Sequence, residues 1–309
     1  LLDPRIVPDW NRDRKIDSSD ENQVTIANPL RFWINDDNDN GDISSGNSDV
    51  PGRYLSSDWA DDYVDGRCDL QDFFPVWLDL KPTLDLLPIS EGYKYRLRHQ
   101  YKWNVIRHSE LHFVYTDLTR DQAGSYLIAE SNSYGASFNV KAHEANTIPI
   151  RSSGVVLSSV FLKKIVNDGN KGVLMIEGTR ATTSPLVLEI LKDDSRVCVV
   201  ELPIKLSSVE EMYRWINLRE AANGAVSRPT DTSEPDNFPD SFSNGKNFVF
   251  VHGYNVNEKQ ARGWNAEIFK RLFQSGSRAK FTAATWFGDS SQITGWLPFV
   301  GPFSISPNY

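Results

Sequence analysis

The stretch that decides the fold of this chain reads Gly172-Val-Leu-Met-Ile-Glu177, then Leu186-Val-Leu-Glu-Ile-Leu191, then Val197-Cys-Val-Val-Glu-Leu202. Each run is short and rich in β-branched or large apolar residues, and polar residues separate it from the next. Short strands at regular spacing, with Asn, Asp or Gly at the turns, are typical of antiparallel β structure. We therefore predict an antiparallel β-sandwich over residues 86–220.

Other segments of this region extend the same pattern. Residues 93–98, 111–115 and 138–141 alternate with period two, and Ser125-Tyr-Leu-Ile-Ala129 is a further short apolar run. The Cys and Trp spacing of antibody domains is absent, so the prediction is limited to an Ig-like or jelly-roll-like sandwich. Residues 158–166 have a helical pattern, and Ser208-Val-Glu-Glu211 has the form of a capping box that opens a helix to Leu218.

Three acidic stretches lie upstream of the sandwich, at residues 9–20, 36–47 and 61–72. Calcium prefers six to eight oxygen ligands, and a 12-residue loop supplies them from positions 1, 3, 5, 7, 9 and 12, with position 7 contributing its backbone carbonyl. Gly41 and Gly66 stand at position 6, where the loop turns sharply, but Arg14 takes that place in the first stretch. These stretches resemble EF-hand loops, and especially the dockerin variant, which accepts Asp at position 12.

The resemblance implies calcium as the cofactor and a calcium-binding loop module over residues 1–85. The implied ligands are Asp9, Asn11, Asp13, Lys15, Asp17 and Asp20; then Asp36, Asn38, Asn40, Asp42 and Asn47; then Asp61, Asp65, Arg67, Asp69 and Asp72. The alternative is that Asp, Asn, Gly and Ser cluster here only as turn residues, whose side chains cap their own backbone. Three such loops in one short segment favour the metal, because so many carboxylates repel one another unless a cation lies among them.

The composition supports this interpretation. The net charge is −8 and the pI is about 5.2, which argues against nucleic acid as a partner. No stretch approaches the length of a membrane span. Because weak calcium loops are typical of extracellular proteins, we expect an extracellular or cell-surface location. Cys68 and Cys198 are compatible with one disulfide or with two buried thiols.

The last part of the chain has a different periodicity. Residues 221–246 are rich in Asn, Ser, Pro, Asp and Gly, which predicts a linker. The continuous apolar strand Asn247-Phe-Val-Phe-Val251, a helix over residues 257–273 and a second strand over residues 280–286 then predict a βαβ unit with strands buried on both faces. Residues 247–309 would thus be a partial α/β segment, which makes the whole chain multidomain α+β.

The residues His252-Gly253-Tyr254 follow the first of these strands. They resemble the oxyanion loop of α/β-hydrolases of the lipase and esterase kind, in which the strand ends in His-Gly. The resemblance implies that the amide of Tyr254 is an oxyanion donor. It ends before the nucleophile elbow, because the chain contains no Gly-x-Ser-x-Gly and no histidine after His252. Ser290, in Gly288-Asp289-Ser290, lacks a downstream Asp-x-x-His and is a poor nucleophile candidate.

Three functions remain open from the sequence. The first is a secreted, calcium-stabilised multimodular protein that forms the N-terminal portion of a hydrolase, with its catalytic Ser, Asp and His outside this chain; the chain alone would then be inactive. The second is a structural or adhesive extracellular protein, such as a surface-layer or filament subunit. In both, the rest of the polypeptide or neighbouring subunits would complete the open sheet. The third is carbohydrate binding through Tyr101 and Trp103.

Overall fold

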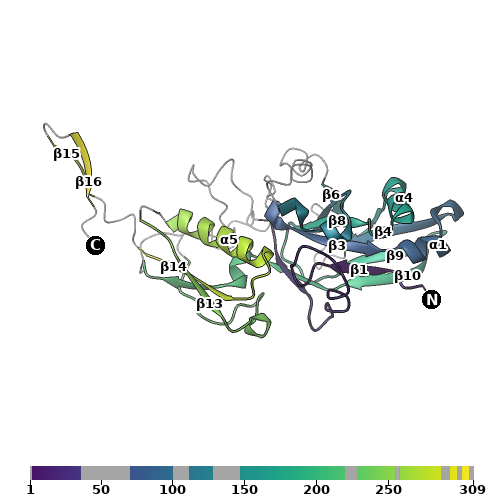
Figure 1. Ribbon diagram of the computed structural model, residues 1–309, viewed down its shortest axis with the longest axis horizontal. Helices are drawn as coiled ribbons and strands as arrows, with labels where there is room; N and C mark the ends of the chain where they lie inside the picture. Colours follow the sequence, from purple (N-terminus) through teal and green to yellow (C-terminus); the bar gives the residue numbers. More distant parts are fainter. Residues whose placement is uncertain are drawn as a thin grey trace.

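The computed structural model describes residues 2–35, 70–99, 111–127, 147–219, 228–254, 256, 258–286, 293–297 and 301–305. Within these residues the chain is α+β, with mostly antiparallel sheets and few helices (Figure 1). The strands are β1 (Arg5–Pro8), β2 (Leu30–Trp33), β3 (Phe73–Asp79), β4 (Tyr93–His99), β5 (Leu111–Tyr115), β6 (Ile148–Ile150), β7 (Val155–Val156), β8 (Val173–Gly178), β9 (Leu186–Lys192), β10 (Ser195–Leu202), β11 (Ile204–Ser207), β12 (Arg214–Asn217), β13 (Asn247–Val251), β14 (Lys280–Thr285), β15 (Ile293–Leu297) and β16 (Gly301–Ile305). The helices are α1 (Lys81–Leu86), α4 (Ser159–Asn167) and α5 (Glu258–Gln274).

Two antiparallel sheets form the larger part of the molecule. One has the strand order β1-β3-β8-β5-β6 and the other β10-β9-β4-β7. Side chains from both sheets, such as Val76 of β3, Leu97 of β4, Ile176 of β8 and Leu188 of β9, belong to one hydrophobic core. The predicted strands at residues 172–202 are confirmed as β8, β9 and β10. The finer assignment, Ig-like or jelly-roll-like, stays a prediction.

The predicted boundary at residue 85 falls within this shared core. β1 and β3 precede that boundary, yet β3 pairs with β8 from Phe73↔Glu177 to Trp77↔Val173. The described part of residues 1–85 therefore contributes strands to the central sheet, and its aromatic residues pack against strands of the next segment. β2 also reaches across, pairing in parallel with β11.

Two local predictions are wrong. The helix predicted from Ser208 to Leu218 is a single 3₁₀ turn, Val209–Met212, followed by strand β12. Ser208 caps the turn as expected, its hydroxyl accepting from the Glu210 amide, but β12 gains backbone partners on β14, which a helix would lose. The run at Ser125 is also a 3₁₀ turn, with Tyr126 buried and its hydroxyl donating to the Phe73 carbonyl. The helix predicted over 158–166 is confirmed as α4.

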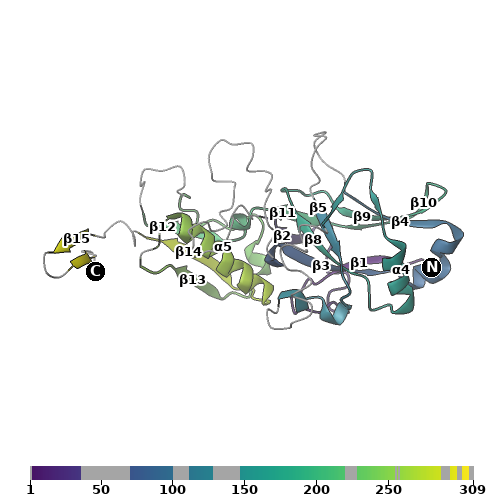
Figure 2. The same ribbon diagram turned by 90° about the horizontal axis from the view of Figure 1, so that it is seen from above.

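The βαβ unit is confirmed. β13, α5 and β14 follow in sequence, and β13 and β14 are parallel. β12 joins them as a third parallel strand, giving the order β12-β14-β13. In both views α5 lies along this small sheet (Figures 1 and 2). The described part of the predicted linker, residues 228–246, packs against the sheet, with Arg228, Asn237 and Phe238 buried.

The prediction that the first strand of this unit is buried on both faces is wrong for the described chain. β13 is the edge strand, and Val249 and Val251 are 59% and 54% exposed. Their neighbours Phe248 and Phe250 point to the other face, where Phe248 stacks on Phe281 at 5.5 Å between ring centroids. Helix α5 covers one face of the sheet, and nothing described covers the valines.

None of the helices in the described ranges combines the length and apolar character needed to cross a bilayer. The hairpin of β15 and β16 lies at the far end of the molecule from the two large sheets (Figure 1). Cys198 is a half-buried free thiol on β10, and Cys68 lies outside the described residues.

Candidate functional site

The first acidic loop, residues 9–20, follows directly after β1. Its backbone turns at Arg12 and Arg14, whose φ angles are 63° and 74°. Arg14 occupies position 6, where the second and third stretches have glycine. This left-handed conformation is unfavourable for a residue with a Cβ, so surrounding contacts must hold it. Position 6 of this loop therefore has the positive φ of the calcium-loop turn, although Arg14 and not glycine occupies it.

Side-chain oxygens hold the loop by bonding its own backbone. The Arg14 amide donates to Asp9 Oδ2 at 3.0 Å, the Asp13 amide to Asn11 Oδ1 at 2.8 Å, and the Lys15 amide to Asp13 Oδ1 at 3.0 Å. These bonds repeat along positions 1, 3 and 5 of the loop. Asx turns of this kind arise wherever Asp and Asn cap their own backbone, so by themselves they fit both the metal and the turn interpretation.

Asp20, at position 12, is the buried end of the loop. Its carboxylate accepts from the amides of Trp10, Asn11 and Asp17 at 2.9, 3.1 and 2.9 Å. Burial raises its pKa, and these backbone bonds act against that rise. The loop is thereby closed, and the charges of its first and last carboxylates, Asp9 and Asp20, affect each other.

The carboxyl group of Asp9 has a strongly raised pKa. Burial, and then the negative charge of Asp20, raise its pKa to about 7 from an ordinary 3.8. Its Oδ1 atom is buried and has no donor at ordinary hydrogen-bond geometry in the described chain, although the Arg12 amide is near enough to the carboxylate to oppose the rise in pKa. A buried carboxylate oxygen without a donor costs free energy unless a proton or a cation satisfies it. This orphaned oxygen fits a calcium ligand.

Within the described ranges, however, no group of three or more His, Cys, Asp or Glu side chains is arranged to hold a metal ion. The loop carboxylates are turned toward backbone amides instead. The predicted ligands from Asp36 to Asp69, which make up the second loop and most of the third, lie outside the described residues.

Asp72, predicted as the last ligand of the third loop, faces a different cation. Its Oδ1 lies 2.8 Å from Lys270 Nζ, both side chains are fully buried, and the Trp33 indole N–H donates to the same oxygen at 2.6 Å. The lysine ammonium supplies the positive charge next to this carboxylate. The contact ties the start of β3 to helix α5.

The His252-Gly253-Tyr254 segment lies at the carboxyl end of β13, where parallel sheets commonly place ligand sites. The His252 ring is buried, and its Nε2 accepts from the Trp286 amide at 3.1 Å and lies 3.0 Å from Thr285 Oγ1. A ring nitrogen that accepts an N–H bond carries no proton, so the proton of neutral His252 is on Nδ1, 2.9 Å from the Gly253 carbonyl. His252 therefore fixes the ends of β13 and β14 relative to each other rather than serving as a base.

The next two residues are accessible. A Cβ built on Gly253 would meet no other atom within 4 Å, and Tyr254 is 41% exposed. The backbone here is therefore open to approach, as an oxyanion loop requires. Ser290 lies outside the described residues.

The sequence analysis missed a group of arginines at one cavity. Arg12, Arg31 and Arg278 are far apart in the chain but line the same pocket. No local pattern signals them, because the three residues lie in segments far apart in the sequence, and the acidic composition hides a local positive charge.

Comparison of the chain with protein-family models, with curated proteins and with solved structures found no match. The functional argument therefore depends on the chemistry of the residues themselves.

Proposed function

We propose that this chain is a calcium-stabilised, multimodular extracellular protein in which residues 9–20 form a structural calcium site. The observation that carries the proposal is the buried Asp9 Oδ1 without a donor, in a loop that already turns at position 6. The side chains of Asp9, Asn11, Asp13, Asp17 and Asp20 and the carbonyl of Lys15 would hold the ion. Calcium would offset the burial that chiefly raises the pKa of Asp9 and the negative charge of Asp20 that raises it further.

The test is thermal unfolding of the full chain in excess calcium and in chelator. Calcium that binds only the folded state stabilises it by RT ln(1 + [L]/Kd), about 2.7 kcal/mol at a hundredfold excess over Kd. Asp9→Asn should remove most of this gain, whereas Asp3→Asn, at a largely exposed carboxylate just before β1, should keep it. An equal calcium shift in the wild type and in Asp9→Asn would refute a site at this loop, and no shift in the wild type would refute calcium binding altogether.

We further propose that residues 247–309 are the start of a lipase- or esterase-like hydrolase domain. The parallel β13-α5-β14 unit and the open backbone at Gly253 support this. The nucleophile would lie outside this chain, so the purified chain should not hydrolyse a short-chain nitrophenyl ester. Hydrolysis that a Ser290→Ala change abolishes would contradict the proposal.

A structural or adhesive role is the second candidate, and the exposed valines of β13 favour it. Val249 and Val251 give an edge strand the apolar surface that pairing with another subunit would cover. Light scattering after size-exclusion chromatography distinguishes the two roles. A stable oligomer that Val249→Glu dissociates supports assembly, and a monomer at all concentrations supports the hydrolase segment.

A further inference from the structure

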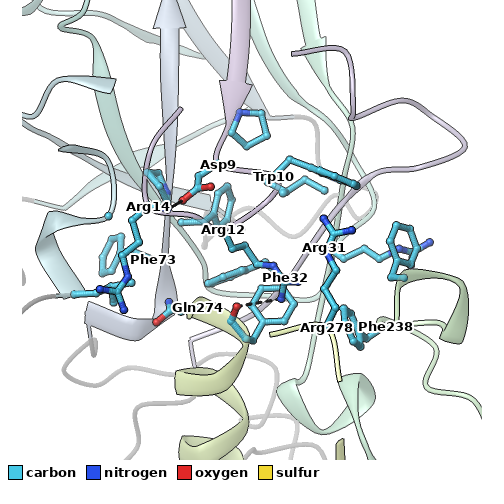
Figure 3. A pocket seen from close by; sticks show the side chains of 18 of the residues that line it. Asp9, Trp10, Arg12, Arg14, Arg31, Phe32, Phe73, Phe238, Gln274 and Arg278 are labelled. Carbon is cyan, nitrogen blue, oxygen red and sulfur yellow. Dashed lines mark hydrogen bonds between the residues drawn. The ribbon is translucent and has the colours of Figure 1, made fainter. Parts of the chain in front are cut away.

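A cavity lies where the 9–20 loop, β2 and β3 meet the end of α5 and residues 238–242 (Figure 3). The cavity is partly open to solvent, and its lining is more apolar than polar. Concave, mostly apolar sites with a few polar groups are typical of small-molecule binding.

Aromatic side chains form a large part of the cavity wall. Phe32, Phe74, Phe238, Phe242 and Phe273 line it, and they come from four separate parts of the chain. Phe273 packs on Phe32 at 6.1 Å and on Phe238 at 5.7 Å between ring centroids. This packing fixes the shape of the apolar wall.

Three arginines, Arg12, Arg31 and Arg278, line the same pocket (Figure 3), and each lies over an aromatic ring. The guanidinium carbon of Arg12 lies 3.9 Å from the centroid of Phe273, that of Arg31 lies 5.3 Å from Phe242, and that of Arg278 lies 4.8 Å from Trp10. A guanidinium that lies over an aromatic ring keeps N–H donors that can bind an anion, although one donor of Arg31 is already directed at the Asp236 carbonyl at 3.4 Å.

Positive side chains outnumber negative ones among the residues that line this pocket. Asp9 attracts Arg12 electrostatically, whereas the buried Arg31 Nε has no hydrogen-bond acceptor in the described chain. Asp9 is the one acid among the residues that line the described cavity, and its carboxylate bonds the Arg14 amide.

We propose that this pocket binds an organic anion with an apolar body, such as a medium-chain carboxylate. The anionic head would bond the guanidinium groups of Arg31 and Arg278, and the body would lie against the phenylalanine wall. Guanidinium and carboxylate form paired, charge-assisted hydrogen bonds, which in a partly buried site are stronger than in water. The chain has a net charge of −8, yet positive charge is in excess at this pocket. This excess favours an anionic ligand over a neutral lipid.

The probe for the test is 8-anilinonaphthalene-1-sulfonate, titrated against the full chain and displaced with decanoate. Decanol, with the same apolar body and no charge, is the matched competitor. Decanoate should displace the dye at concentrations at least about tenfold below those that decanol needs, the ratio that about 1.4 kcal/mol represents. Equal displacement by decanol and decanoate would overturn the anion site, and so would failure of the dye to bind.

Variants locate the site. Arg31→Gln and Arg278→Gln should each weaken decanoate binding about tenfold, as expected for loss of a charged hydrogen bond. Arg151→Gln, at an exposed arginine elsewhere, should leave binding unchanged. Arg12 is not used because it also donates to the Phe273 carbonyl at 3.1 Å and its loss would disturb the wall. If both glutamine variants melt like the wild type and still bind decanoate equally well, the proposal is refuted.

Discussion

The buried ion pair between Glu210 and Arg262 should be a principal contact that holds helix α5 in place. Arg262 Nε and Nη2 donate to Glu210 Oε1 and Oε2, each at 3.0 Å, and both side chains are fully buried. Removing one partner of such a pair leaves a charge buried and uncompensated, which costs about 3–5 kcal/mol. We expect Arg262→Met to reduce the free energy of unfolding by this amount.

The companion variants separate the pair from simple packing. Replacing both residues by Met leaves no buried charge, and such replacements are often neutral or stabilising. The double variant Glu210→Met, Arg262→Met should therefore be more stable than Arg262→Met alone. Arg271→Met provides the control, because Arg271 lies on the same helix with its side chain 66% exposed and should change stability by less than about 1 kcal/mol.

Urea unfolding followed by tryptophan fluorescence measures these differences. The loss of about 3 kcal/mol in Arg262→Met should also lower Tm by about 6 °C or more. The reasoning is refuted if the double variant is destabilised by the sum of the two single changes. That result would mean that each side chain acts through its own packing and that the charges are not coupled.

Other contacts give further expectations. In chelator, Asp9 keeps its proton up to about pH 7 in the folded state but loses it near pH 3.8 in the unfolded state. The contribution of Asp9 to the free energy of unfolding is therefore present at low pH and is lost as the pH rises through 7. At pH 8 in chelator, Asp9→Asn should therefore have a higher free energy of unfolding than the wild type, by at most about 4 kcal/mol. In calcium the wild type should be the more stable of the two. Urea titrations in which the same protein is more stable in both buffers would contradict this. His252→Ala leaves the Trp286 amide without its acceptor and should cost about 1–3 kcal/mol, and a melting curve that matches the wild type would exclude that role. Val249→Thr, at an exposed position, should raise solubility without changing Tm, and precipitation assays at equal concentration test this.

Sequence periodicity predicted the parts of the fold in which local pattern and tertiary contacts agree. β8, β9 and β10 appear where short apolar runs occur, and β13, α5 and β14 appear where an apolar strand gives way to helical spacing. Such agreement between local preference and the final structure is what makes an element readable from sequence.

The helix predicted after Ser208 failed because the deciding contacts are remote. Its capping signal is real, since the Ser208 hydroxyl accepts from the Glu210 amide. Only the presence of β14, far along the chain, makes the extended conformation of Arg214–Asn217 favourable, through the register that pairs Trp215 with Ala283. The residues around Ser208 give no information about β14, with which β12 pairs.

The candidate sites divide in the same way. The acidic loop at residues 9–20 is contiguous, so its spacing could be read directly. The arginine pocket could not, because Arg12, Arg31 and Arg278 meet only after β2 and the end of α5 have come together. Residue counts also pointed away from it, since an overall acidic composition says nothing about how the remaining positive charges are distributed in space.

The position of β12 has a consequence for how this chain could have been assembled by recombination. β12 lies before residues 228–246, yet its hydrogen-bonded neighbour β14 lies after them. A gene fusion at the apparent junction near residue 246 would deliver β13 and β14 without the strand that borders them on the far side. Neither half supplies the whole of this three-stranded sheet, so a cut near residue 246 would separate strands that are hydrogen-bonded to each other.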